Sequence, residues 1–516
     1  MKRKSLIAVL SLLCAALFVA CSPKRGEENY LKVIPNESML VLKLETGALL
    51  EKSGVLDNMF VSVAINKQIA DYPEPIKELL QAAVKNPESL GIDIEKPAYM
   101  AVVDVANEAL LATVALSDVA AFEKAFAVLS EGAVPVTDKY GMKCIEFGEP
   151  EIAVVYDDER LVIATGKRNL DIAYYLTLPE EKMAAKSERY ARFFDSEEDV
   201  NVVMNLSSFI GFAVEEDILD ESLAPLFIAQ YDGKMANASL DFQNGRVELV
   251  SEVEMSDEAI ELANNIIKTS THCHHKYIPG SSIFVLNLNL DLMPVIDVLA
   301  QTPLLEQLNS NYGVNEEALQ QVFAAISGEW TAAMWADENN LDIPMFFVGV
   351  ECSDRSLFDL LVTYSSVLLN TVKVEEDVYS LKTPSVDVDF TLLYKNGSIM
   401  FMPSSHYKEI AVSDGLKPYS ANADDLKLFS SKKDLFVLSA APLLRLLEAE
   451  IRNSGNTRNI DDEEAAAFFV GLFNSLHVQG SANSSVIQLN TSDSSVNSLK
   501  FLFDKLSLYF TLQGIE

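Results

Sequence analysis

The chain has 516 residues, of which 49% are apolar and 22% are charged, and its formal net charge at pH 7 is −36. Single hydrophobic cores stop growing at roughly 250–300 residues, so this length predicts more than one domain. The acidic balance excludes nucleic acid as a partner and argues against electrostatic docking on anionic lipid, because both carry negative charge.

Residues 1–20 are typical of a bacterial signal peptide. A basic start from Lys2 to Lys4 precedes the uncharged and mostly apolar run Leu6 to Ala20. That run is too short to span a bilayer comfortably, but it has the length of a signal-peptide core. We therefore expect export from the cytoplasm.

Cys21 directly follows this run, and Ala20-Cys21 resembles a lipoprotein cleavage site. Phe18 departs from the Leu that usually stands three residues before the cysteine. The sequence predicts a lipid on the Cys21 thiol and amine, a membrane anchor through that residue, and a tether over 21–29. An ordinary secretory signal with an incidental Cys21 is the alternative. Ser22 favours the outer membrane, and whether the body faces the periplasm or the outside stays open.

The mature chain repeats several patterns in the same order. The stretch LKVIPNESMLVLKL (31–44) matches HKYIPGSSIFVLNL (275–288), and the apolar residues at every second position predict a one-sided strand in each. Ser117-Asp118 and Ser353-Asp354 each suit the start of a helix. Two hairpins follow, the second with an Asn396-Gly397 turn. The stretches 253–268 and 489–506 each predict a strand that leads into a helix.

This repetition predicts an ancient duplication. The expected fold class is α+β, with two similar tandem halves over 30–270 and 271–516. Each half is expected to be a mainly antiparallel sheet covered by helices.

The segment His272-Cys273-His274-His275 is the chain's densest group of metal-binding residue types. A zinc site needs ligands that converge in a tetrahedron, usually from two separated pairs, and adjacent residues on one strand cannot all point inward. We interpret the segment as a linker between the halves and predict no metal site, with these four residues as weak candidates.

Other candidate chemistry is sparse. Cys144, Cys273 and Cys352 remain after export, and we expect mainly buried free thiols with at most one pair. Trp330 and Trp335 are five residues apart on an expected strand, so they point to opposite faces and pack in the core.

The acidic runs Glu215–Asp217 and Asp461–Glu464 lack the spacing of a calcium loop and suit solvated loops. Nucleophile-elbow, phosphate-loop and zinc-protease motifs are missing from the sequence. No catalytic residue and no cofactor is predicted.

The chain resembles uncharacterised Bacteroidales lipoproteins that are classed as a domain of unknown function. The resemblance rests on the lipoprotein signal, then Ile34-Pro35 with its alternating strand, and then LLEKSG at Leu49 to Gly54. It implies attachment to the outer membrane and supplies no catalytic residues.

We therefore expect a non-enzymatic binding or scaffolding lipoprotein of the cell envelope, with a protein or polymer partner. The partner surface is expected at the junction of the halves or at loops such as Arg452 to Glu464. The first alternative is a carrier of a lipid or other amphiphile in an apolar cavity. The second is an envelope hydrolase without a recognisable motif.

Overall fold

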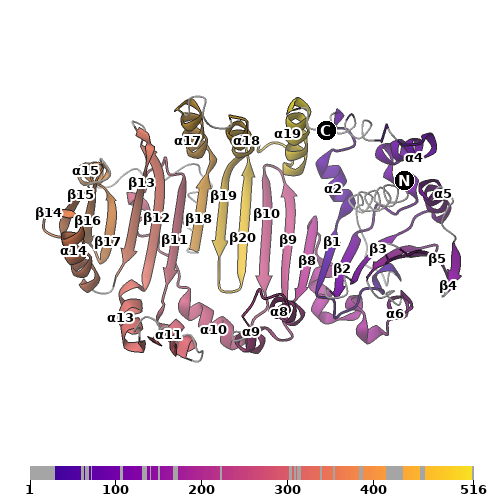
Figure 1. Ribbon diagram of the computed structural model, residues 1–516, viewed down its shortest axis with the longest axis horizontal. Helices are drawn as coiled ribbons and strands as arrows, with labels where there is room; N and C mark the ends of the chain where they lie inside the picture. Colours follow the sequence, from indigo (N-terminus) through magenta and orange to yellow (C-terminus); the bar gives the residue numbers. More distant parts are fainter. Residues whose placement is uncertain are drawn as a thin grey trace. The chain divides into compact units, whose positions relative to one another are not determined.

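The computed structural model covers the whole chain, and its ribbon is drawn in Figure 1. It describes residues 29–59, 63, 69–70, 72–104, 109–130, 136–139, 141–148, 151–166, 172–220, 224–300, 305–306, 309–310, 315–337, 340–352, 355–382, 388–413, 434–453 and 460–513. The signal peptide and Cys21 lie outside this part. The chain divides into two compact units, Met1–Glu254 with Asp493–Glu516, and Met255–Ser492.

The first unit is built around strand β1 (Leu40–Leu44), which pairs antiparallel with β2 (Ala98–Asp104) on one side and with β8 (Val200–Asn205) on the other. The sheet continues from β2 through β3 (Ala109–Ala115), β7 (Arg160–Thr165), β6 (Glu151–Tyr156) and β5 (Met142–Gly148) to β4 (Thr137–Lys139). On the other side, β8 leads to β9 (Met235–Gln243) and β10 (Arg246–Val253).

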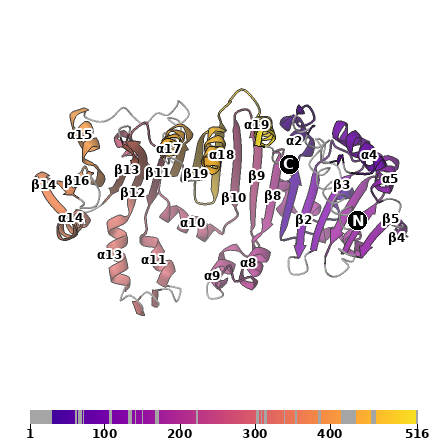
Figure 2. The ribbon, with the colours of Figure 1, turned by 45° about the horizontal axis from the view of Figure 1, so that its top comes forward.

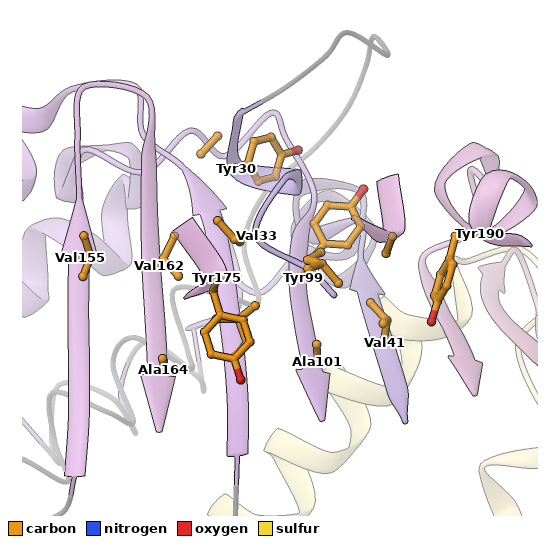
Figure 3. Packing of buried hydrophobic residues seen from close by; sticks show 14 of the residues in the cluster. Tyr30, Val33, Val41, Tyr99, Ala101, Val155, Val162, Ala164, Tyr175 and Tyr190 are labelled. Carbon is orange, nitrogen blue, oxygen red and sulfur yellow. The ribbon is translucent and has the colours of Figure 1, made fainter. Parts of the chain in front are cut away.

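Strand β1 was predicted correctly, but its buried face was not. Of the predicted face, Leu44 is buried but Leu40 and Leu42 are only half-buried, whereas Val41 and Lys43 on the other face are buried. Side chains cover both faces of the sheet here, so the alternation of apolar residues does not identify the inner face. Figure 3 shows Val41 packed in one cluster with side chains from neighbouring strands and with Tyr30 and Tyr99.

Helices of the first unit include α2 (Thr46–Ser53), α4 (Glu74–Lys85), α5 (Val119–Leu129), α8 (Leu206–Glu215) and α19 (Ser498–Gln513). The predicted cap of α5 is confirmed, because the Asp118 carboxylate accepts the Ala121 N–H at 3.0 Å. Ser353-Asp354, the matching cap, lies outside the described residues.

In the second unit, β11 (Phe284–Leu290) pairs with β12 (Gly328–Asp337) and with β18 (Asp434–Ser439). The sheet runs from β12 through β13 (Asn340–Glu351), β17 (Ser398–Pro403), β16 (Asp389–Lys395) and β15 (Val378–Lys382) to β14 (Asn370–Glu375). Beyond β18 lie β19 (Phe473–Gly480) and β20 (Ser484–Thr491). This is the order of pairing found in the first unit.

The described helices of the second unit include α10 (Asp257–Ile266), α11 (Met293–Ala300), α13 (Glu316–Ile326), α14 (Ser356–Leu368), α15 (Ser404–Ser413), α17 (Ala440–Asn453) and α18 (Ile460–Gly471). Asp461–Glu464, expected in a loop, instead lies in the first turn of α18, where carboxylates are stabilised by the helix dipole.

Two other predictions are confirmed. Asn396 and Gly397 both have positive φ, 54° and 75°, as their turn type requires. Trp335 and Trp330 pack in different hydrophobic clusters.

The expected fold class is wrong, because it gave each of two tandem halves a separate helix-covered sheet. The strands that the structure describes are assigned to one open antiparallel sheet of twenty strands. The compact units also do not follow chain order, since α19 packs against α2 in the first unit and α10 packs against α11 in the second. A helix that follows a hairpin can bury its apolar face on any neighbour within reach. Sequence matching does not show which neighbour that is.

Candidate functional site

The predicted metal candidates lie within the second unit, beside β11 and β12. His272 and His274 are buried, as is Glu329 of β12, which is 0% exposed, and Cys273 is half-buried. The segment that we interpreted as a linker is therefore packed against the sheet.

Glu329 holds this segment through a fully bonded carboxylate. Its Oε2 atom accepts the Thr271 N–H at 2.6 Å and the Thr271 hydroxyl at 2.8 Å. Its Oε1 atom accepts the Cys273 N–H at 2.6 Å and the Asn287 amide at 3.1 Å. Burial alone would raise the pKa of Glu329, but these bonds lower it to about 2. The carboxylate is therefore ionised at neutral pH.

Two neighbouring groups, His274 and Cys273, are neutral at pH 7. Burial lowers the pKa of His274 to about 4, and its Nδ1 atom lies 3.0 Å from the Thr331 hydroxyl oxygen. Burial, followed by the charge of Glu329, raises the pKa of Cys273 to about 12. A neutral thiol is a poor nucleophile, so Cys273 does not have the character of a catalytic cysteine.

Cys273, His274 and Glu329 are the group that comes closest to a metal site in the described residues, with ligand atoms within 4.8 Å of one another. A carboxylate offers about four acceptor positions, and four donors already occupy those of Glu329. Metal binding would require some of these bonds to break. The arrangement fits a structural clamp better than a metal site.

Three further histidines make contacts with other protein groups. The His275 Nδ1 atom lies 2.6 Å from the His272 carbonyl oxygen. His406 contacts the Tyr277 carbonyl through Nε2 at 2.8 Å, and His477 contacts Asn490. Cys144, Cys273 and Cys352 are free thiols.

The first unit contains its own buried charges. The Lys52 ammonium donates to Asp199 at 2.7 Å and to Asp241 at 2.8 Å, and Asp199 also accepts the Phe242 N–H. Burial would lower the pKa of Lys52, but the bonds to both aspartates raise it above its ordinary value. These ion pairs and hydrogen bonds connect α2 to β9 and stabilise the packing between them.

A cavity of about 70 Å³ lies in the first unit, lined by residues of α7 (Ala191–Asp195), β8, β9 and β10. Its lining includes Arg192, Ser196, Glu198 and Glu252 together with apolar groups. Drug-sized ligands occupy roughly 300–1,000 Å³ in largely apolar pockets, so this cavity does not suit an amphiphile.

Among the described residues, the most exposed large apolar side chains lie on α14. This helix precedes β14, the strand at one end of the second unit's pairing order (Figure 1). Val367 is 79% exposed and Leu368 is 75% exposed. We define the α14–β14 face as the exposed side chains of Leu360, Leu361, Tyr364, Val367 and Leu368 on α14, the helix that leads into β14.

Helix α14 has a second apolar stripe in addition to the one that packs on the sheet. The core cluster below the helix includes Phe358 and Val362, together with Leu369, which directly follows the helix. The exposed residues Leu360 to Leu368 recur at spacings of three and four on another side. A helix that is apolar on two sides is expected to contact two surfaces, and among the described residues α14 packs on the sheet. Contiguous exposed apolar groups mark interaction sites.

Our sequence reasoning missed this face, although the signal was present. SLFDLLVTYSSVL has apolar residues around most of its circumference, more than one stripe requires. The surface expected at Arg452 to Glu464 lies mostly outside the described residues. Residues 454–459 and the side chains of 451–463 lie outside the described part.

The fold and its sites define an antiparallel-sheet protein with buried structural charge clusters and an exposed apolar face. The chain belongs to the family described as Domain of unknown function (DUF4836), which matches residues 30–455. The expected membership in a domain-of-unknown-function family is thus confirmed. A search of curated proteins finds no match.

Three solved structures of TP0453 show weak similarity. Crystal form I has a TM-score of 0.26 and 11% identity, over 44% of this chain and 79% of that chain. Form III has a TM-score of 0.26 and 11% identity, over 46% and 88% of the two chains. Form IV has a TM-score of 0.26 and 12% identity, over 46% and 84%. This similarity is too low to establish a common fold or function.

Proposed function

We propose that this protein is a non-enzymatic binding protein of the bacterial cell envelope that holds a partner at the α14–β14 face. The observation that carries the proposal is the exposure of Val367 and Leu368 beside the other apolar residues of that face. Exposed apolar groups that adjoin one another favour association, because each loses contact with water when a partner covers it.

The buried clusters support binding over catalysis. Glu329 and Asp199 are almost fully buried, and their carboxylates are bonded to neighbouring protein groups. The histidine and cysteine beside Glu329 have pKa values shifted toward their neutral forms. These groups are arranged to hold the fold.

We further propose that a lipid on Cys21 anchors the protein at the outer membrane of a Bacteroidales-type bacterium, facing either the periplasm or the outside. The sequence of the signal segment supports this anchor. Among the helices of the described residues, none combines the length and apolarity needed to span a bilayer.

Site-specific photocrosslinking in cells tests the binding face. A benzoyl-phenylalanine at Tyr364 should give a discrete adduct, identified by mass spectrometry, that Leu368→Ser removes. The same group at Ile218, which is also exposed but lies in the first unit, should not give that adduct. Equal adducts at both positions, or none at Tyr364, would argue against this function.

Labelling with palmitate tests the anchor. The natural protein should take up label, and Cys21→Ala should take up none. Equal label in both would refute lipidation. External protease added to the same cells then reports which side of the membrane the body faces.

A further inference from the structure

The structure itself contains a helix of the kind that would fit the α14–β14 face. In the first unit, α5 follows β3 and precedes the β4–β5 hairpin, as α14 follows β13 and precedes the β14–β15 hairpin. Helix α5 is covered by α4, and Ile76 and Leu80 of α4 share a buried cluster with Leu129 of α5. An amphipathic helix thus completes the burial of α5.

In the described part of the second unit, no helix packs on α14 as α4 packs on α5. Helix α13 stands between β11 and β12, as α4 stands between β1 and β2, but α13 packs against α11 (Figure 2). Leu361 and Tyr364 of α14 are consequently exposed. The stripe from Leu360 to Leu368 is about 12 Å long at a rise of 1.5 Å per residue, which matches two to three turns of a partner helix.

The net charge of the chain favours a basic partner. Arg355 is already bonded to Asp359 and to Asp377, and Lys373 lies over the Tyr379 ring. Glu375 and Glu376 are exposed at the end of β14. The chain as a whole carries a net charge of −36, so positive residues beside the apolar stripe of a partner would be attracted.

Two other occupants fit less well. Addition of a strand to β14 is opposed by the irregular register between Lys373 and Glu375, since bulges and charged residues block pairing at sheet edges. A second copy of this chain would bring a second large negative charge to the face.

We infer that the α14–β14 face binds an amphipathic helix of a partner polypeptide, with an apolar stripe like that of α4 and basic residues on either side. This inference rests on the proposed function and specifies the partner class for the same surface.

The test uses the full chain with Cys21→Ala, to avoid the lipid, and two fluorescent peptides. One has the α4 sequence EPIKELLQAAVK, and the other has the same sequence flanked by lysines. We expect saturable binding, tighter for the lysine-flanked peptide and weakened by salt. Leu361→Ser with Leu368→Ser should weaken binding by at least about tenfold, and Ile218→Ser, the matched control, should leave it unchanged.

Several results would overturn the inference. One is that neither peptide shows saturable binding. Another is that the variant with both Leu361→Ser and Leu368→Ser binds the peptides as tightly as the natural sequence. A dimer in light scattering that the double variant abolishes would assign the face to a second copy. Flotation with phosphatidylcholine vesicles that depends on the same residues would assign it to lipid. If the peptides fail while the Tyr364 adduct persists, the proposed function stands and the helical partner is wrong. If neither peptide binding nor the Tyr364 adduct is observed, both the helical partner and the proposed function are wrong.

Discussion

The carboxylate of Glu329 accepts both the backbone N–H and the hydroxyl of Thr271, at 2.6 and 2.8 Å. This fully buried carboxylate thereby fixes the segment that contains His272 to His275. Its burial is favourable only because the donors replace water, and so the contact is sensitive to changes in the charge of Glu329.

Glu329→Gln should destabilise the second unit by about 3 kcal/mol, because an amide NH₂ cannot accept the Cys273 and Asn287 hydrogen bonds. The pKa of Glu329 is lowered from 4.5 to about 2, so its contribution is present above pH 4.5 and lost as pH falls toward 2. Thermal melts across this range should show the variant losing less stability on acidification than the natural protein. Glu375→Gln, on the exposed end of β14, is the control.

Gly349→Ala should lower stability by about 1–3 kcal/mol through overpacking. A Cβ atom at this position would lie 2.9 Å from the rings of both His274 and Phe347. Adding His274→Ala should recover part of the loss, since one of the two clashes disappears. Urea unfolding of the single and double variants measures the coupling, and purely additive effects would contradict it. Gly471→Ala, where the space around the added Cβ is open, serves as the reference.

The two sides of α14 should respond differently to substitution. Phe358→Ala removes a fully buried ring from the core and should cost about 3–5 kcal/mol. Val367→Ser changes an exposed side chain and should stay within about 0.5 kcal/mol. Denaturant titrations followed by circular dichroism measure both. A large loss for Val367→Ser would mean that this residue is covered in solution.

Lys52→Met should destabilise the first unit by about 2 kcal/mol, because it leaves Asp199 and Asp241 close together without their shared cation. Protonation relieves this repulsion, so the difference in melting temperature from the natural protein should shrink as pH falls toward 4. Lys77→Met is the matched control, since Lys77 pairs with the exposed Glu74 on one helix. An equal effect of both substitutions would show that the cluster has no special role.

Sequence periodicity predicted local structure more reliably than packing. It placed the strands at Leu40–Leu44 and Phe284–Leu290, the Asp118 cap and the Asn396-Gly397 turn, because each depends on a few adjacent residues. It did not reveal that Lys43 is buried, since the partners of its ammonium group, Glu45 and the Ser196 carbonyl, include a residue distant in sequence.

The candidate sites show the same limit. The histidine segment was visible in the sequence, but Glu329, which determines its chemistry, is distant from it and is one of many carboxylates. The α14–β14 face could have been suspected from the excess of apolar residues in α14. Its exposure depends on where α13 packs, and that is decided by tertiary contacts.

The placement of α19 bears on how the chain can be made. This helix lies against α2, and the Asn58 amide donates to Asp504 at 2.7 Å, so residues from both ends of the chain complete the first unit. A polypeptide that emerges N-terminus first must therefore hold the first unit unfinished until residues 498–513 appear. Premature termination before Ser498 would damage the part that was synthesised earliest, and a chaperone that protects the waiting surface of α2 would be needed most during that interval.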